Sequence, residues 1–279
     1  MPRCGCTRNP KGRLDEFWRS WRAYRESCHV WEYAKVGFGR IMATVAAHYE
    51  SHLAPVYLWM VGGIDDALAA GANDIAGLAC SGGLAVDLGA GFGMHAIPLA
   101  RTGCAVLAID TSAFLLAQLK QYGAGLPIDL VCGDLLEFRR HLNRNADLIV
   151  CMGDTLAHLE DHARLESLFR EVAAALAPNG KFVATFRDYS KPLSGESRFI
   201  LVRSDADGIL TCFLEEETEH VLVHDILHAR EGGAWTMKVS SYRKLRVSAT
   251  VVAAALRAAG LKSSISQGPR GMLRVVAGA

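Results

Sequence analysis

Residues 85–93 have the sequence AVDLGAGFG, in which a short apolar run ends at Asp87 and three glycines follow at alternate positions. An apolar run of this length is typical of a strand that is buried on both faces of a parallel sheet. Gly89, Gly91 and Gly93 let the backbone bend sharply, and no Cβ keeps a ligand away from it. The stretch therefore predicts a strand, a glycine turn and a helix start that together hold a ligand.

The sequence from residue 84 onward alternates between strand and helix patterns. We predict strands at 84–88, 105–109, 129–132, 148–152 and 181–186, and helices at 94–101, 112–122 and 160–176. Alternation at this spacing is typical of a doubly wound α/β fold with a mostly parallel sheet. Pro178-Asn179-Gly180 predicts a chain reversal after the third helix.

Residues 199–247 break this rhythm and predict an antiparallel β insertion. Three extended segments are expected at 209–218, 220–231 and 234–247, with turns at Asp207-Gly208 and Gly232-Gly233. Ser248 predicts the N-cap of a helix that ends at Gly260, and strands near 262–266 and 272–277 complete a seven-stranded sheet.

The remaining N-terminal third is predicted to be a tail followed by helices. Residues 1–12 form the tail, and helical patterns cover 14–31, 40–53 and 64–70. We divide the chain into four parts. Residues 1–80 are a tail and helical cap, residues 81–198 an α/β core, residues 199–247 an insertion that serves as a lid or a dimer surface, and residues 248–279 a closing helix with strands.

Composition favours a soluble enzyme core over a polyanion-binding or membrane protein. The net charge is +1, 51% of the 279 residues are hydrophobic, and charges interrupt every long apolar run. No export signal is visible, so we expect a cytoplasmic protein with reduced cysteines, of which Cys104, Cys132 and Cys151 lie in the core. Cys4 and Cys6 do not predict a metal site, because no second cysteine pair lies nearby. The histidines at 220, 224 and 228 do not predict one either, because residues four apart on a strand are about 13 Å from each other.

A second acidic residue, Asp110, ends the next predicted strand. Successive parallel strands deliver their carboxylates to the same sheet edge, where ribose hydroxyls can donate to them. Dinucleotide enzymes use a related loop, but their pattern is G-x-G-x-x-G and this one is G-x-G-x-G.

The loop at residues 89–93 resembles motif I of class I S-adenosylmethionine-dependent methyltransferases, and the resemblance runs from about residue 84 to 186. Asp110 resembles the ribose-binding acid of that family, and Gly133-Asp134-Leu135 the segment that faces the adenine amino group. The resemblance implies a Rossmann-like methyltransferase with S-adenosylmethionine as cofactor and S-adenosylhomocysteine as product. The expected cofactor contacts are Tyr57, Trp59, Asp87, Gly89, Ala90, Gly91, Asp110, Thr111, Gly133, Asp134, Leu135, Cys151, Met152 and Gly153. For Tyr49, Tyr57 and Trp59, simple core packing of the N-terminal helices stays an alternative.

Residues 151–159, CMGDTLAHL, resemble the CxGNSxxHL stretch of glycine N-methyltransferase and other small-molecule methyltransferases. Asp154-Thr155 replaces Asn-Ser, so glycine as the substrate is not implied. No [DN]-P-P-[YF] motif follows this strand, which lowers the expectation of base or glutamine-amide methylation.

Catalysis is expected to need alignment of an acceptor more than covalent chemistry. His158 is the candidate base because imidazole titrates near neutral pH, and Asp154 would orient a substrate amine or support His158. A helix-start histidine bonded to backbone is the alternative. Arg187 and Tyr189 follow the fifth strand and predict contacts to a small, acidic substrate, although surface ion pairs would explain such arginines equally well.

The predicted function is methyl transfer to a nitrogen or oxygen of a small molecule, without nucleic acid or membrane partners. Alternatives are an RNA or protein methyltransferase and a non-catalytic S-adenosylmethionine-binding protein. A homodimer through the insertion or the N-terminal helices also stays open.

Overall fold

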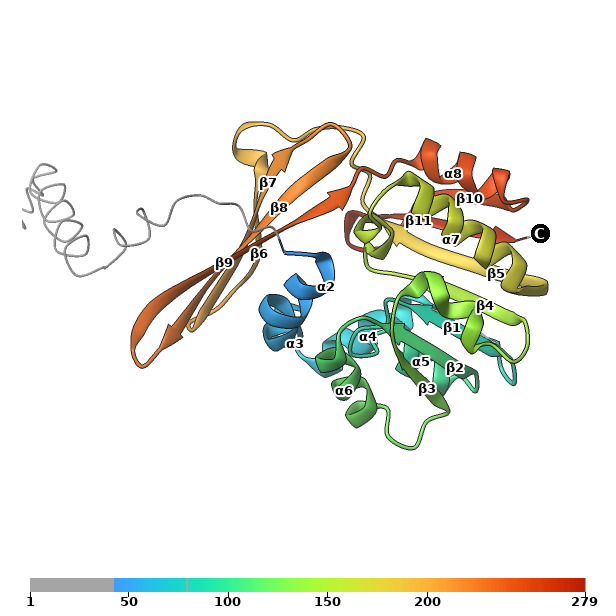
Figure 1. Ribbon diagram of the computed structural model, residues 1–279. Helices are drawn as coiled ribbons and strands as arrows, with labels where there is room; N and C mark the ends of the chain where they lie inside the picture. Colours follow the sequence, from blue (N-terminus) through green and yellow to red (C-terminus); the bar gives the residue numbers. More distant parts are fainter. Residues whose placement is uncertain (1–42, 79, 279) are drawn as a thin grey trace, which may run out of the picture. The chain divides into compact units, whose positions relative to one another are not determined.

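The computed structural model describes residues 43–78 and 80–278 (Figure 1). Its central sheet has seven strands in the order β10-β11-β5-β4-β1-β2-β3. Their bounds are β1 Leu84–Leu88, β2 Ala105–Asp110, β3 Ile128–Cys132, β4 Ala146–Cys151, β5 Leu176–Phe186, β10 Lys262–Gln267 and β11 Leu273–Gly278. The strands pair in parallel except around β11, which runs antiparallel to both of its neighbours. The predicted mostly parallel, doubly wound sheet is confirmed.

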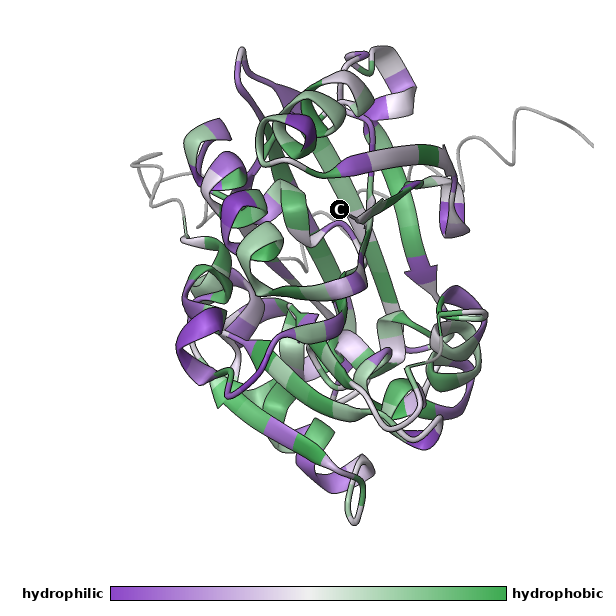
Figure 2. Cartoon of the chain, turned by 90° about the vertical axis from the view of Figure 1, so that its right-hand side faces the viewer, coloured by the Kyte–Doolittle hydropathy of each residue, from purple (hydrophilic) through white to green (hydrophobic). Residues whose placement is uncertain are grey.

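Helices cover both faces of this sheet because successive side chains of each strand point to opposite sides. In β1, Val86 packs with α7 and α8, whereas Ala85 packs in a separate cluster with α4, α5 and α6. The helices span α4 Ile64–Asp74, α5 Ala96–Arg101, α6 Ala113–Tyr122, α7 His162–Ala175 and α8 Ala249–Ala258. Figure 2 shows hydrophobic strands at the centre and helices of mixed character around them. Strands buried on both faces explain why the sequence shows continuous apolar runs.

The predicted chain reversal at residues 178–180 lies inside β5. The register of β5 against β4 moves from Ala146↔Leu176 to Leu148↔Lys181, so extra residues bulge out of the ladder. Asn179 has a φ of 66°, a left-handed conformation that asparagine tolerates better than most residues. The turn chemistry is therefore used within an irregular strand start instead of between two elements.

The insertion forms a second, antiparallel sheet with the order β6-β7-β8-β9. Its strands are β6 Phe199–Ser204, β7 Gly208–Glu216, β8 His220–Glu231 and β9 Ala234–Leu245. The antiparallel insertion is confirmed, but the expectation of three strands is wrong, because residues 199–204 add a fourth. Every residue of β6 is exposed, so the run FILVRS lacks the alternation by which a half-buried strand is predicted.

Residues 43–60 form a helical segment, here called the cap, that packs on the second sheet. The cap consists of α2 Val45–His48, a π-helical turn Tyr49–Leu53, a 3-10 turn Ala54–Val56 and α3 Tyr57–Met60. Leu53 packs with Leu210 and Leu227 of the sheet. The predictions for residues 1–12 and 14–31, the Cys4/Cys6 pair and the first residues of the 40–53 helix lie outside the described residues.

Two expectations about cysteines are wrong. Cys80 and Cys104 form a disulfide, with Cα atoms 5.6 Å apart, so the cysteines are not all reduced thiols. Cys132 is exposed at the end of β3, which is the outermost strand of the sheet, whereas Cys104 and Cys151 are buried as expected.

The described residues contain no single helix with the length and hydropathy of a membrane span. One helix pair, Val45–Met60 with Ile64–Asp74, meets both criteria jointly but is bent by 86°.

Candidate active site

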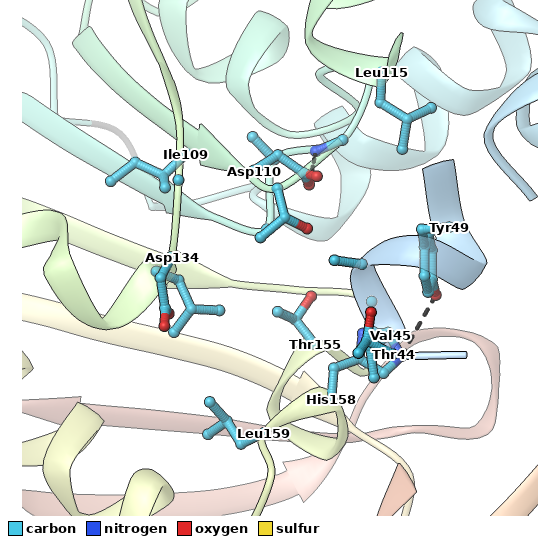
Figure 3. A pocket seen from close by; sticks show the side chains of 18 of the residues that line it. Thr44, Val45, Tyr49, Ile109, Asp110, Leu115, Asp134, Thr155, His158 and Leu159 are labelled. Carbon is cyan, nitrogen blue, oxygen red and sulfur yellow. Dashed lines mark hydrogen bonds between the residues drawn. The ribbon is translucent and has the colours of Figure 1, made fainter. Parts of the chain in front are cut away.

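A cavity of about 750 Å³ opens at the carboxyl ends of the parallel strands, between the glycine loop, the loops after β2, β3 and β4, and the cap (Figure 3). In an open α/β sheet this is where ligands bind. The predicted site residues that line it are Tyr57, Gly89, Ala90, Gly91, Asp110, Thr111, Gly133, Asp134, Leu135, Met152, Gly153 and His158. Twelve residues separated by up to 101 positions therefore converge on one space.

The glycine loop can be built only with glycine at its key positions. Gly89 and Gly91 have φ values of 78° and 54°, in the left-handed region that side chains rarely adopt. A Cβ at Gly89 would lie 2.7 Å from Cγ2 of Thr155. The loop therefore turns tightly under the cavity and presents bare backbone to whatever fills it.

Asp110 is held in place by two backbone amides. Gly91 N donates to Oδ2 at 2.8 Å, and Ser112 N donates to Oδ1 at 2.8 Å. Burial raises the pKa of this carboxyl despite those bonds. A carboxylate fixed at the rim of a strand edge suits the vicinal hydroxyls of a ribose.

The loop after β3 also lines the cofactor end of the cavity. Asp134 caps the following 3-10 turn, with Leu136 N donating to Oδ1 at 2.9 Å, and its side chain is about half exposed (53%). Figure 3 shows Asp110 and Asp134 on the same side of the cavity, away from His158. Bare glycine backbone, a fixed carboxylate and a second acid fit the ribose and adenine of S-adenosylmethionine.

Asp87 ends β1 beneath the glycine loop and does not line the cavity. It is buried, and neither carboxylate oxygen makes a hydrogen bond of standard geometry with a described residue, although the backbone amide of Ala96 lies near enough to oppose the rise in its pKa. Burial raises its pKa to about 6. An orphaned acid at this point fits the ammonium of an amino-acid ligand near the loop, reached directly or through water.

His158 lies at the other end of the cavity, on a 3-10 turn Thr155–His158 after β4. Its Nε2 is 3.4 Å from the hydroxyl of Tyr49, as Figure 3 shows, and the two rings meet edge-on with centroids 5.1 Å apart. Burial and the charge of Lys244 lower the pKa of His158 to about 3. The imidazole is therefore neutral near pH 7.

Asp154 lies behind His158 and not in the cavity wall. Its Oδ1 accepts from Arg187 N at 2.9 Å, and its Oδ2 accepts from the Tyr189 hydroxyl at 3.0 Å and from Lys244 Nζ at 2.8 Å. Burial alone would lower the pKa of Lys244, but the charge of Asp154 holds it well above its usual range. Burial raises the pKa of Tyr189 to about 12. The network therefore consists of an ion pair, Asp154 with Lys244, and the neutral Tyr189 hydroxyl that donates to Asp154.

Other predicted residues lie away from the cavity. The indole of Trp59 donates to Asp205 at 2.5 Å and packs on Gly208, which holds the cap on the second sheet. The Cys151 side chain is fully buried under the sheet edge. Arg187 is exposed and approaches the site only through its backbone amide, while Tyr189 reaches Asp154 and not the cavity.

The sequence does not predict contacts between distant segments. These are the contacts of Lys244 and Tyr242 of the insertion with Asp154 and His158, and the contact of Glu50 of the cap with Ser112.

The three histidines of β8 lie on one strand, as predicted, and each half-buried ring has its own surroundings. His220 Nε2 is 2.9 Å from the carbonyl of Glu160, and His224 Nε2 is 2.8 Å from Glu215 Oε2. Within residues 43–78 and 80–278, no group of three histidine, cysteine, aspartate or glutamate side chains could hold a metal ion.

Comparison with known proteins identifies the core. Residues 85–180 match the family model described as "Methyltransferase domain". A glycine/sarcosine N-methyltransferase from Halorhodospira halochloris is 28% identical over 106 residues, which are 37% of this chain and 40% of that protein. The chain thus spans less than half the length of this curated relative.

Solved structures share the fold over most of the chain. The CcbJ methyltransferase from Streptomyces caelestis has a TM-score of 0.70 at 21% identity, covering 84% of this chain and 98% of that one. CalS10, an amino pentose methyltransferase from Micromonospora echinaspora solved with S-adenosylmethionine bound, has a TM-score of 0.66 at 18% identity, covering 80% and 94%. The predicted enzyme class and cofactor are confirmed: residues 85–180 are the core of a class I S-adenosylmethionine-dependent methyltransferase.

Proposed function

We propose that the protein methylates an amino group of a small polar molecule. The observation that carries this proposal is the position of His158, which lines the same cavity as the cofactor loops and lies beside the hydroxyl of Tyr49. The named relatives support nitrogen as the acceptor atom, since one is a glycine/sarcosine N-methyltransferase and another an amino pentose methyltransferase.

An amine is protonated near pH 7, and its nitrogen becomes nucleophilic only when that proton leaves. S-adenosylmethionine, when bound, supplies a methyl group on a positively charged sulfur. Asp110 and the backbone of Gly89 and Gly91 would hold its nucleoside part, and Asp87 would face its ammonium. His158 would accept the proton of the acceptor ammonium, with the Tyr49 hydroxyl fixing the orientation of the ring.

The network behind His158 is buried and its two charges are paired. Asp154 and Lys244 neutralise each other, and Tyr189 stays protonated. Asp154 therefore acts as a positioning residue in this proposal, because it holds the loop that carries His158 and does not reach the cavity. Exclusion of water favours alignment of the acceptor and protects the cofactor from hydrolysis.

The cap and the second sheet, residues 43–60 and 199–247, would close the acceptor side as a lid. Arg187 and Tyr189 as substrate contacts, and an acidic substrate, remain subsidiary proposals, because both side chains would have to move to reach the cavity.

The test is a panel of paired acceptors that differ only in nitrogen or oxygen, such as glycine with glycolate and an amino sugar with its parent sugar. We expect S-adenosylhomocysteine release with amines and not with their hydroxyl partners. His158→Gln should lower turnover by about 10² to 10⁴, the range of a general base, with S-adenosylmethionine affinity unchanged by calorimetry. His141→Gln, at an exposed position, is the matched control.

Release with only the hydroxyl members would replace the amine by an alcohol acceptor. Cofactor binding without release for any small molecule would instead favour a macromolecular acceptor or a binding protein. Full turnover by His158→Gln at every pH would remove its role as base.

A further inference from the structure

Three consecutive cap residues, His48, Tyr49 and Glu50, reach three different parts of the molecule. They lie where α2 passes into the π-helical turn Tyr49–Leu53. Successive side chains leave a helix about 100° apart, so these neighbours have different surroundings, although the rings of His48 and Tyr49 both contact Tyr242. Short π-helical turns occur often at functional sites.

His48 fixes the cap to the second sheet. Its ring is fully buried, with Nε2 2.9 Å from Asp225 Oδ2 and Nδ1 2.7 Å from Ser240 Oγ. Tyr242 stacks on the ring at a centroid distance of 4.1 Å. Burial would raise the pKa of Asp225, but the bonds from His48 and Cys212 lower it, so this anchor is a closed and charged cluster.

Glu50 points the other way, toward the core. Its Oε2 accepts a hydrogen bond of 2.5 Å from the hydroxyl of Ser112, and Phe114 N lies 3.4 Å from the same oxygen. Both partners belong to the beginning of α6, which has ten residues. Glu50 itself is exposed, so water competes for this contact in a way that it cannot for His48.

Ser112 connects Glu50 to Asp110, the acid assigned to the ribose. Its backbone amide donates to Asp110 Oδ1 at 2.8 Å, and its hydroxyl both accepts from Leu115 N at 3.2 Å and donates to Glu50. Ser112 is fully buried. Any fixing of Asp110 by a bound ligand therefore also fixes the donor that Glu50 needs.

Tyr49 stands between the two anchors and lines the cavity on the acceptor side. Its hydroxyl is the 3.4 Å partner of His158, and its ring also packs against Tyr57 with centroids 6.1 Å apart. Its ring also meets Tyr242 of the second sheet edge-on, with centroids 6.2 Å apart. The position of Tyr49 therefore depends on its own ring contacts and on the two different walls that its chain neighbours, His48 and Glu50, contact.

We propose that Glu50 is a positioning residue that couples occupancy of the nucleoside site to the placement of Tyr49 beside His158. Binding at Asp110 orders Ser112, Ser112 holds Glu50, and Glu50 draws the cap closed over the acceptor end. This inference rests on the proposed function only for calling that end the acceptor side.

The experiment is amide hydrogen exchange of residues 43–57 with and without saturating S-adenosylhomocysteine, which needs no acceptor. We expect the ligand to slow exchange in the wild type on the order of tenfold, the factor that one charge-assisted hydrogen bond supplies. Glu50→Ala should lose that slowing while its S-adenosylhomocysteine affinity stays close to wild type. Glu50→Gln should retain most of it, because an amide oxygen still accepts from Ser112.

Glu166→Ala, at an exposed position on α7, is the control and should match the wild type. Unchanged slowing in Glu50→Ala would overturn the proposal, and so would a loss of slowing as complete in Glu50→Gln as in Glu50→Ala. A fall in affinity as large as that of Asp110→Ala would make Glu50 a cofactor contact instead. Failure of every amine acceptor, with the exchange results intact, would refute only the proposed function.

Discussion

The two ends of the cavity are built in different ways. At the cofactor end, Gly91, Asp110 and Asp134 lie on consecutive strand-to-helix loops within 44 residues of each other. At the acceptor end, His158 meets Tyr49 across 109 positions, and Asp154 meets Lys244 across 90. Short loops after neighbouring strands position the first end, whereas packing between the cap, the core and the second sheet positions the second. Local substitutions should therefore damage one property at the cofactor end and several at the acceptor end.

The largest effect is expected for Asp154→Ala. It leaves Lys244 as an uncompensated charge with a side chain only 12% exposed, and it removes the acceptor of Tyr189 and Arg187 N. Breaking a buried pair lowers the free energy of unfolding by about 3 to 5 kcal/mol. Denaturant unfolding with turnover in parallel measures both losses.

Glu231→Ala provides the matched control for that substitution. It breaks the 3.0 Å pair with Lys238, whose side chains are more than half exposed, and such pairs contribute about 0 to 1 kcal/mol. Equal losses in the two variants would show that the acceptor end is not held by its buried pair.

The elements of the core follow from the sequence more closely than those of the second sheet. Strand β1 matches its predicted bounds because burial on both faces leaves a continuous apolar run. Strand β6 was missed because it is exposed throughout and is defined only by pairing with β7. The disulfide between Cys80 and Cys104 could not be predicted either, since it depends on the approach of a loop to the start of β2.

Asp110→Ala should have the next largest effect, chiefly on cofactor binding. Two backbone amides lose a charged acceptor, and the ribose loses its own. At about 1.5 to 3 kcal/mol for each hydrogen bond to a charge, we expect S-adenosylmethionine affinity to fall roughly a hundredfold or more by calorimetry. Asp129→Ala, an exposed acid on the neighbouring strand, should bind normally. Unchanged affinity in Asp110→Ala would contradict the ribose assignment.

The same contrast decides which site residues were predictable. Gly89, Gly91 and Asp110 carry their chemistry in a local spacing, and the structure brings them to the cavity. Trp59 and Arg187 were chosen by proximity in sequence, but their side chains point to the second sheet and to solvent. Lys244 was invisible as a partner of Asp154 because nothing local links β9 to the loop after β4.

The low pKa of His158 predicts a pH effect on stability. In the unfolded chain the ring titrates at its ordinary value of 6.5, and in the folded chain at about 3. Between these values the unfolded state binds the extra proton, so stability falls as pH drops below 6.5, by at most about 1.4 kcal/mol per pH unit. His158→Gln should show a shallower fall from pH 6.5 to 4.5 in thermal unfolding. Parallel curves for the two proteins would contradict the low pKa and would mean that the folded cavity solvates the imidazolium.

The smallest effect comes from two serines with the same local task. Ser112 caps α6 and Ser248 caps α8, each accepting from the amide three residues on at 3.2 Å. Loss of such a cap lowers stability by about 1 kcal/mol, so Ser248→Ala should unfold slightly earlier and bind S-adenosylmethionine normally. Ser112→Ala should show a similar loss from the cap, plus weaker closure of residues 43–57, because only Ser112 also holds Glu50. Measuring both variants by thermal unfolding and hydrogen exchange separates the effect of the helix N-cap from the effect of the contact with Glu50. Identical results for the two variants would show that residues 43–57 and the cofactor end are independent.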